Sequence, residues 1–153
     1  MNAESVGFTG TSQIGAVTAK QLKDGERLLY SLYSEGYKEF HHGDCIGADE
    51  QFHAVAKRIG FKIIIHPPEN NSKRAFCFGA DTVLEEKAYL IRNHAIVDET
   101  NVLIAVPKSA AEELRSGTWA TVRYARKAKH RIYILMPEGY GTSRMADTFA
   151  LIP

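Results

Sequence analysis

Residues 38–65 read KEFHHGDCIGADEQFHAVAKRIGFKIII and contain one complete strand–turn–helix–strand unit. The stretch 38–42 predicts a strand. From Phe52 to Ile59, apolar residues recur at i, i+3, i+4 and i+7, which is one face of a helix. The β-branched run 61–65 is typical of a strand buried on both faces. Strands that alternate with helices in this way predict a parallel α/β sheet.

The same alternation continues on both sides of this unit. Further strands are expected at about 5–9, 102–106 and 132–136. Further helices are expected within 14–33, 84–95 and 119–125, the first with a kink or break near Asp24–Gly25, and 69–81 reads as an exposed loop. We therefore expect a Rossmann-like three-layer sandwich. Its sheet would be mainly parallel and five-stranded, in the order 3-2-1-4-5.

Composition limits the class of protein. The chain has 153 residues, a formal charge of +1, 44% hydrophobic and 24% charged residues. These values predict one domain over 1–153, with 137–153 as a C-terminal tail that could reach a second subunit of a homodimer. The near-neutral charge disfavours a protein that mainly coats nucleic acid. No apolar run approaches the ~18 residues of a membrane span and no signal segment is visible, so we expect a cytoplasmic protein.

Cysteines and histidines give no metal pattern. Cys45 and Cys77 form no CxxC pair, and the six histidines lack metal-ligand spacing. The sequence therefore predicts no metal and no disulfide framework. It predicts no cofactor either.

Ligands of such sheets bind beyond the carboxyl ends of the strands, where the strand order reverses. The loops after the first, second and fourth strands should therefore form the site. Glycine and hydroxyl residues collect in the first and last of these loops: Gly10, Thr11 and Ser12, then Ser116, Gly117 and Thr118. Glycine lets a ligand approach the backbone, and free amides with hydroxyls suit an anion such as phosphate. The alternative is that the hydroxyls only cap helices.

The second loop, HGDCIGAD at 42–49, adds two glycines and two acids. Gly43 and Gly47 flank the turn and should place further amides at the sheet edge. Asp44 and Asp49 would repel a phosphate, so they would accept hydrogen bonds from ribose hydroxyls or a base, or act as a general base. Alternatively, Asp49 caps the helix and Asp44 stabilises the turn. The loops fit neither G-x-G-x-x-G nor the P-loop pattern, which excludes a dinucleotide dehydrogenase and a P-loop NTPase.

Four stretches, taken in order, resemble the SLOG superfamily of DprA-like and LOG-like Rossmann proteins. They are a Gly-hydroxyl turn, HGDCIGAD, LIRNHAIVDETNVLIAVP (90–107) and SGTWATVRYA (116–125). That superfamily includes small stand-alone phage and bacterial members. The resemblance implies a domain that binds nucleotides or nucleotide-derived ligands, often as a dimer. It adds Arg92 and Asn93 to the ligand-binding set. The alternative for Arg92 is a surface ion pair with Glu85, Glu86 or Asp98.

The departures from the family pattern bear on activity. The corresponding stretch of LOG-type phosphoribohydrolases resembles PGGxGTxxE, whereas here the glycine pair before Gly117 is absent and Thr121 stands in place of the glutamate. A nucleotide-binding module is therefore the first hypothesis. The second is an N-glycosidase or deoxyribosyltransferase-like enzyme on nucleoside monophosphates, with Asp49 or Asp44 as the catalytic carboxylate.

A third hypothesis is a DprA-like single-stranded DNA binder. It would use the basic residues Arg123, Arg126, Lys127 and Lys129. The simpler explanation is that these cations interact with the carboxyl end of a helix dipole.

Overall fold

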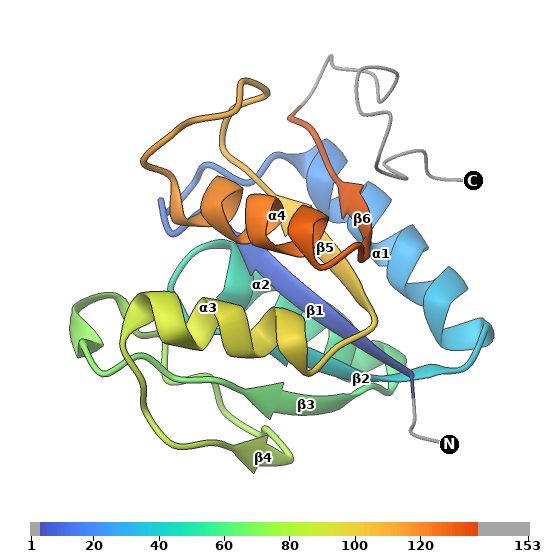
Figure 1. Cartoon of the computed structure of the whole chain (residues 1–153). Helices are drawn as coiled ribbons and strands as arrows, with labels where there is room; N and C mark the ends of the chain where they lie inside the picture. The colour runs from blue at the N-terminus through green and yellow to red at the C-terminus, as the bar shows by residue number, and fades with distance from the viewer. Residues whose placement is uncertain (1–3, 138–153) are drawn as a thin grey trace.

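The computed structural model describes residues 4–137 and consists of one parallel sheet between two layers of helices (Figure 1). The strands are β1 (Glu4–Gly10), β2 (Tyr37–His42), β3 (Lys62–Ile65), β4 (Thr82–Val83), β5 (Val102–Val106) and β6 (Arg131–Ile134). The helices are α1 (Ala19–Ser34), α2 (Ala48–Ile59), α3 (Tyr89–Asp98) and α4 (Gly117–Lys127), with a short 3-10 turn at Asn71–Lys73. The six strands run in the order β4-β3-β2-β1-β5-β6, and every pair is parallel.

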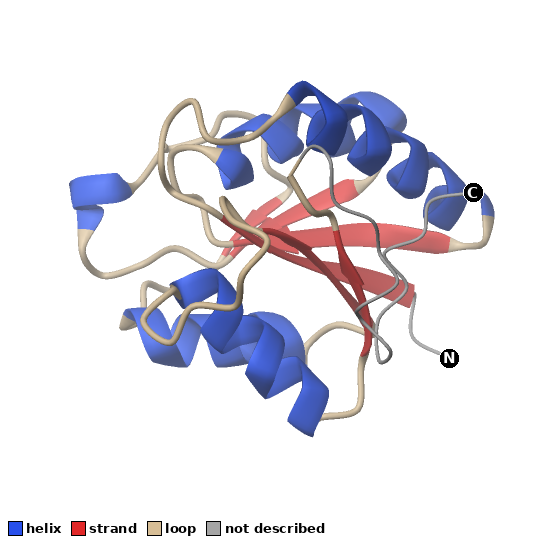
Figure 2. Ribbon diagram, turned by 90° about the horizontal axis from the view of Figure 1, so that it is seen from above, coloured by secondary structure: helices blue, strands red, loops and turns tan. Residues whose placement is uncertain are grey.

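The helices cover both faces of the sheet (Figure 2). On one face, α1 and α2 pack through Leu29 and Phe52 against Phe8 and Phe40. On the other face, α4 packs through Trp119 within a second apolar cluster. Neighbouring residues of β5 belong to different clusters because successive strand side chains point to opposite faces. This explains why β5 is apolar at every position.

The predicted fold class is confirmed, with one strand added. The five predicted strands are present in the predicted order, and the sheet is parallel throughout rather than mainly parallel. The prediction missed β4, an exposed edge strand of two residues that is too short for a periodic signal. The expected loop 69–81 contains a 3-10 turn, and the helix expected from residue 84 begins only at Tyr89, because the chain first forms β4.

The first helix differs from expectation at Gly25. It runs without a break from Ala19 to Ser34, so the expected kink is absent. A Cβ atom at Gly25 would overlap the ring of Phe52 on α2. The glycine therefore serves the close approach of two helices and not a change of direction.

No helix of residues 4–137 is long and apolar enough to cross a membrane. The predicted tail lies outside the described residues apart from Pro137.

Gly25→Ala should destabilise the protein although alanine is the better helix former by ~1 kcal/mol. The added methyl group overlaps Phe52, and such overpacking costs roughly 1–3 kcal/mol. Urea unfolding measures the difference. Ser34→Ala, at an exposed position of the same helix, is the control and should change stability little. A more stable Gly25→Ala protein would contradict this account of the packing.

Candidate functional site

A cavity of about 950 Å³ lies at the carboxyl ends of the strands, where the strand order reverses beside β1 and β5. The loops after β1, β2 and β5 line it, together with the first turns of α3 and α4. The lining includes these predicted site residues: Gly10, Thr11, Ser12, Gly43, Asp49, Arg92, Asn93, Ser116, Gly117 and Thr118. Asp44 and Gly47 are not among the lining residues. That the lining residues bind a ligand stays a prediction.

The turns after β1 and β5 are neighbours because their strands pair, with Gly10 opposite Val106. Within residues 4–137, the backbone N–H groups of Ser12, Gly117 and Thr118 have no hydrogen-bond acceptor. The last two open α4, where the first amides of any helix lack intrahelical partners. All three residues line the cavity, and we call their N–H groups the donor cluster; those of Gly117 and Thr118 lie at the positive end of the α4 dipole.

The second turn does not offer its amides to the cavity, contrary to expectation. The N–H groups of Gly43 and Cys45 donate to Asp49 Oδ2 at 3.1 and 3.2 Å. The Asp44 N–H donates to His42 Nδ1, and the Ile46 N–H donates to the carbonyl of Lys73. These donors are already used within the protein, so this turn contributes shape and charge rather than an anion-binding set of amides.

Gly47 packs against the turn after β1. It has a φ of 90°, and a Cβ atom there would lie 2.6 Å from the carbonyl oxygen of Thr11. The adjacent Ala48 N–H donates to that same carbonyl at 2.9 Å. Only glycine combines this backbone conformation with such close contact. The role of Gly47 is therefore to hold Thr11 and Ser12 at the cavity edge.

Arg92 is buried at the wall of the cavity and forms none of the expected ion pairs. Its Nη1 donates to the carbonyls of Gly43 and His66, and its Nε donates to Asn93 Oδ1 at 2.7 Å. Within residues 4–137, the hydrogen-bond partner of its Nη2 is the Cys45 sulfur, at 3.7 Å. No carboxylate of residues 4–137 lies within ion-pair distance of Arg92. The positive charge of Arg92 therefore makes the electrostatic potential in the cavity more positive.

Asp44 anchors residues 70–77, which we call the strap. Its carboxylate accepts hydrogen bonds from Arg74 Nε and from the Cys77 N–H, both at 2.9 Å. Its carbonyl accepts from the Ala75 N–H at 2.7 Å. Burial acts to raise the pKa of Asp44, but the hydrogen bonds from Cys77 and Arg74 outweigh burial and leave this pKa below its usual value. This geometry supports a structural role for Asp44, as in the alternative in which it stabilises the turn.

The strap and the rim supply lining residues that sequence reasoning missed. These are Asn70, Ser72, Lys73, Tyr89, Lys108 and Arg115. Lys108 and Arg115 belong to the loop between β5 and α4. The sequence already predicted that this loop lies at the sheet edge, so their position in it could have identified them as candidate lining residues. The strap residues gave no signal, because only their contacts with Asp44 bring them to the cavity.

Asp49 is the buried acidic group of the cavity wall, which Glu113 also lines, and it lies in the first turn of α2. Burial raises its pKa to about 6, although Arg92 and the N–H groups of Cys45 and Gly43 act to lower it. Burial and the nearby Asp49 likewise raise the pKa of the Cys45 thiol to about 11. Cys45 is therefore a neutral thiol near pH 7 and not an activated nucleophile.

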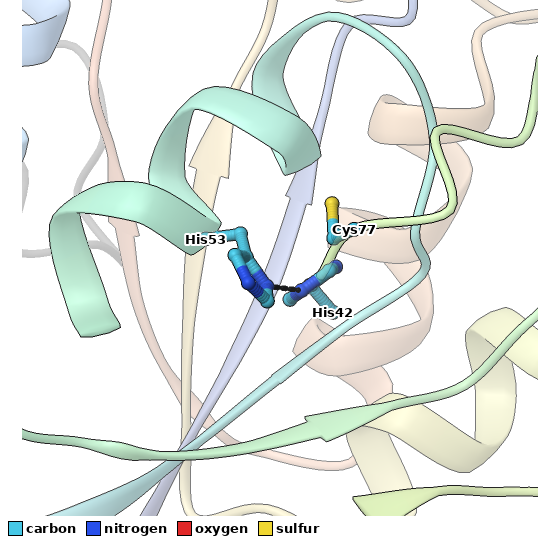
Figure 3. Close-up of side chains that lie close together, drawn as sticks. All are labelled: His42, His53 and Cys77. Atoms are coloured by element: carbon cyan, nitrogen blue, oxygen red, sulfur yellow. Dashed lines mark hydrogen bonds between the residues drawn. The ribbon is translucent and has the colours of Figure 1, made fainter. Parts of the chain in front are cut away.

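His42, His53 and Cys77 form a buried group beside the strap that their sequence spacing did not indicate (Figure 3). His53 Nε2 donates to the Phe78 carbonyl at 2.9 Å, so its Nδ1 accepts from His42 Nε2, also at 2.9 Å. His42 Nδ1 in turn accepts from the Asp44 N–H. Burial, with His53 next in effect, lowers the pKa of His42 to about 3, so His42 is neutral near pH 7.

The same hydrogen bonds argue against a metal ion at this group. If His42 Nε2 bound a metal, its Nδ1 would carry the proton and would face the Asp44 N–H donor. The Cys77 thiol donates to Asp44, which together with burial raises its pKa and opposes formation of a thiolate ligand. The group fits a hydrogen-bond chain that joins β2, α2 and the strap.

Asp49→Asn should stabilise the protein above pH 6. The pKa of Asp49 is higher in the folded state than the usual 3.8, so wild-type stability falls as pH rises from about 4 to about 6. The variant lacks this charge and should be more stable at pH 8 by roughly 1–3 kcal/mol, with no difference at pH 4. Urea unfolding of both proteins at the two pH values measures this. A variant that is less stable at pH 8 would show that ionised Asp49 supports the fold.

Asp44→Asn should loosen the strap without changing the turn. Asp44 has a φ of 60°, a conformation that asparagine also adopts. Loss of the buried pair with Arg74 should cost about 1–3 kcal/mol and speed hydrogen exchange at the amides of Ala75 and Cys77. Glu86→Gln removes only the half-exposed partner of Arg74 and should leave these amides protected. Equal protection in both variants would rule out Asp44 as the anchor.

Comparisons with known proteins identify relatives of the fold only. No protein-family model matches the chain, and no curated protein matches its sequence. A molybdenum cofactor binding protein from the phototrophic bacterium Rippkaea orientalis has a similar structure, with a TM-score of 0.68 and 21% identity over 90% of this chain and 79% of that chain. The molybdenum cofactor carrier protein of Chlamydomonas reinhardtii aligns with a TM-score of 0.63 and 21% identity over 87% and 76% of the two chains. Similarity at this level of identity shows that the chain shares the Rossmann-like fold of these carriers.

Proposed function

We propose that this protein is a SLOG-type binding module whose cavity holds a nucleotide or a nucleotide-like ligand by its phosphate. The observation that carries the proposal is the donor cluster of Ser12, Gly117 and Thr118, whose N–H groups lack acceptors within residues 4–137. A phosphate satisfies such amides and interacts favourably with the helix dipole. Lys108 and Arg115 line the same cavity and add positive charge.

The remainder of the cavity suits a polar heterocycle. Asn70, Asn93 and Tyr89 line it beside Arg92. The Asn93 carbonyl oxygen accepts from Arg92, which leaves its amide NH₂ as a donor for a ligand. The structurally similar carriers bind the molybdenum cofactor, so a phosphorylated pterin is a second ligand type to test beside nucleotides.

Binding without turnover is favoured over a LOG-like hydrolase. Thr121 stands at the position of the glutamate in the LOG-type pattern. It is buried, and its hydroxyl donates to the Gly117 carbonyl at 2.9 Å. It therefore stabilises the first turn of α4 and offers no carboxylate to a substrate. Asp49 and Glu113 are the carboxylates that line the cavity and could serve an N-glycosidase, and release of free base from nucleoside monophosphates would identify that activity.

The single-stranded DNA hypothesis gains no support from the basic residues of α4. Arg123 and Arg126 both pair with Glu112, at 2.9 and 3.3 Å. These pairs neutralise part of the positive charge that DNA binding would require.

Gly117→Pro tests the donor cluster directly. Gly117 is the first residue of α4, where proline is well tolerated, and Ser116 has the extended conformation (φ −79°, ψ 129°) that a following proline requires. The variant should keep its thermal stability but lose about tenfold in affinity for inorganic pyrophosphate and nucleoside monophosphates, since one charge-assisted hydrogen bond is worth roughly 1.5 kcal/mol. Isothermal titration calorimetry measures the affinities.

Gly117→Ala is the matched control. It keeps the N–H group, and its Cβ atom would meet nothing within 4 Å. It should bind these ligands nearly as well as the wild type does. Equal binding by the proline variant, or no binding of pyrophosphate by the wild type, would overturn the proposed phosphate site. The molybdenum cofactor and the four common nucleoside monophosphates, titrated in the same way, would identify the ligand type.

A further inference from the structure

One oxygen of Asp49 has no partner although the residue is buried. Asp49 is 5% exposed, and it lines the cavity. Its Oδ2 accepts both the Gly43 and the Cys45 N–H groups, whereas its Oδ1 has no hydrogen-bond partner within the described residues. A buried carboxylate oxygen without a donor is costly, so such a group in a native protein requires an explanation.

Neighbouring donors of the protein are committed elsewhere. Arg92 directs its N–H groups to the carbonyls of Gly43 and His66, to Asn93 and to the Cys45 sulfur. The Asp44 and Ile46 amides are also used, by His42 and by the Lys73 carbonyl. No group of the described residues therefore supplies a donor for Oδ1, and a ligand group in the cavity that Asp49 lines can supply it.

We infer that Asp49 Oδ1 accepts a hydrogen bond from a hydroxyl or amino group of the bound ligand and thereby determines specificity. This inference rests on the proposed function and extends it. The ligand then combines an anionic group with a neutral donor group. Repulsion by the Asp49 carboxylate disfavours a phosphate beside it, so the phosphate binds the donor cluster and the neutral donor group faces Asp49.

Asparagine at position 49 should invert this preference. The Gly43 and Cys45 N–H groups both point at the Oδ2 position, so the amide oxygen of asparagine must occupy it. The NH₂ group then replaces Oδ1 and presents a donor where the wild type presents an acceptor. The change is isosteric and keeps both hydrogen bonds to the turn.

Calorimetric titrations with four probes test the inference: guanosine 5′-monophosphate, inosine 5′-monophosphate, 2′-deoxyguanosine 5′-monophosphate and inorganic pyrophosphate. The guanosine–inosine pair differs by the 2-amino group, which guanine shares with pterins, and the guanosine–deoxyguanosine pair differs by the ribose 2′-hydroxyl. We expect the wild type to prefer the guanosine nucleotide about tenfold over the analogue that lacks the group facing Asp49. Asp49→Asn should remove or reverse that preference. The affinity of this variant for pyrophosphate should be at least as high as that of the wild type.

Glu50→Gln is the matched control, because Glu50 is exposed, lies in the same helical turn and carries the same charge. It should retain the wild-type preference. If pyrophosphate binds but the wild type does not distinguish the three nucleotides, or if Asp49→Asn keeps the same preference, the inference about Asp49 is overturned and the phosphate site stands. If pyrophosphate does not bind the wild type, the proposed function itself fails.

Discussion

The buried guanidinium of Arg92 joins α3 to the carboxyl ends of two strands, and the candidate site depends on this contact. Arg92 donates to the carbonyls of Gly43, just after β2, and His66, just after β3. A Cβ atom at Gly43 would occupy the space of the guanidinium. The position of the Arg92 side chain therefore requires glycine at position 43. The contact satisfies two carbonyls that β-sheet pairing leaves free and brings a positive charge to the cavity wall.

Around this contact, the cavity lining offers groups of two kinds. One kind is the set of backbone N–H groups of Ser12 and of the start of α4. The other is the carboxylate of Asp49, whose raised pKa reflects its burial. A buried acid that weakens the fold near neutral pH is a stability cost, and such costs are common where a protein binds ligands. The Asp44 carboxylate, only five residues earlier, differs because Arg74 and the strap satisfy it.

The similarity to molybdenum cofactor carriers concerns the fold, and the ligand has to be identified by experiment. At 21% identity the fold is shared, and its switch point between β1 and β5 is where ligands of open α/β sheets bind. The same architecture serves many functions, so the ligand has to be argued from the lining residues. The ligand that we propose on that basis is an anion that carries a hydrogen-bond donor.

The sequence by itself determined the order of strands and helices and the loops that meet at one edge. Strand 61–65 and the helix face of 52–59 have strong local periodicity, and the handedness of parallel crossovers leaves few topologies. It did not reveal the two-residue β4, which has no periodic signal. Only the tertiary structure decided which groups are free. The N–H groups at 43–46 of the HGDCIGAD turn donate to Asp49, to His42 and to the Lys73 carbonyl, whereas those of Ser12 and Gly117 have no acceptor within residues 4–137. Hydrogen-bond partners distant in sequence, such as Asp44 with the strap, depend on packing, and local sequence patterns carry no information about them.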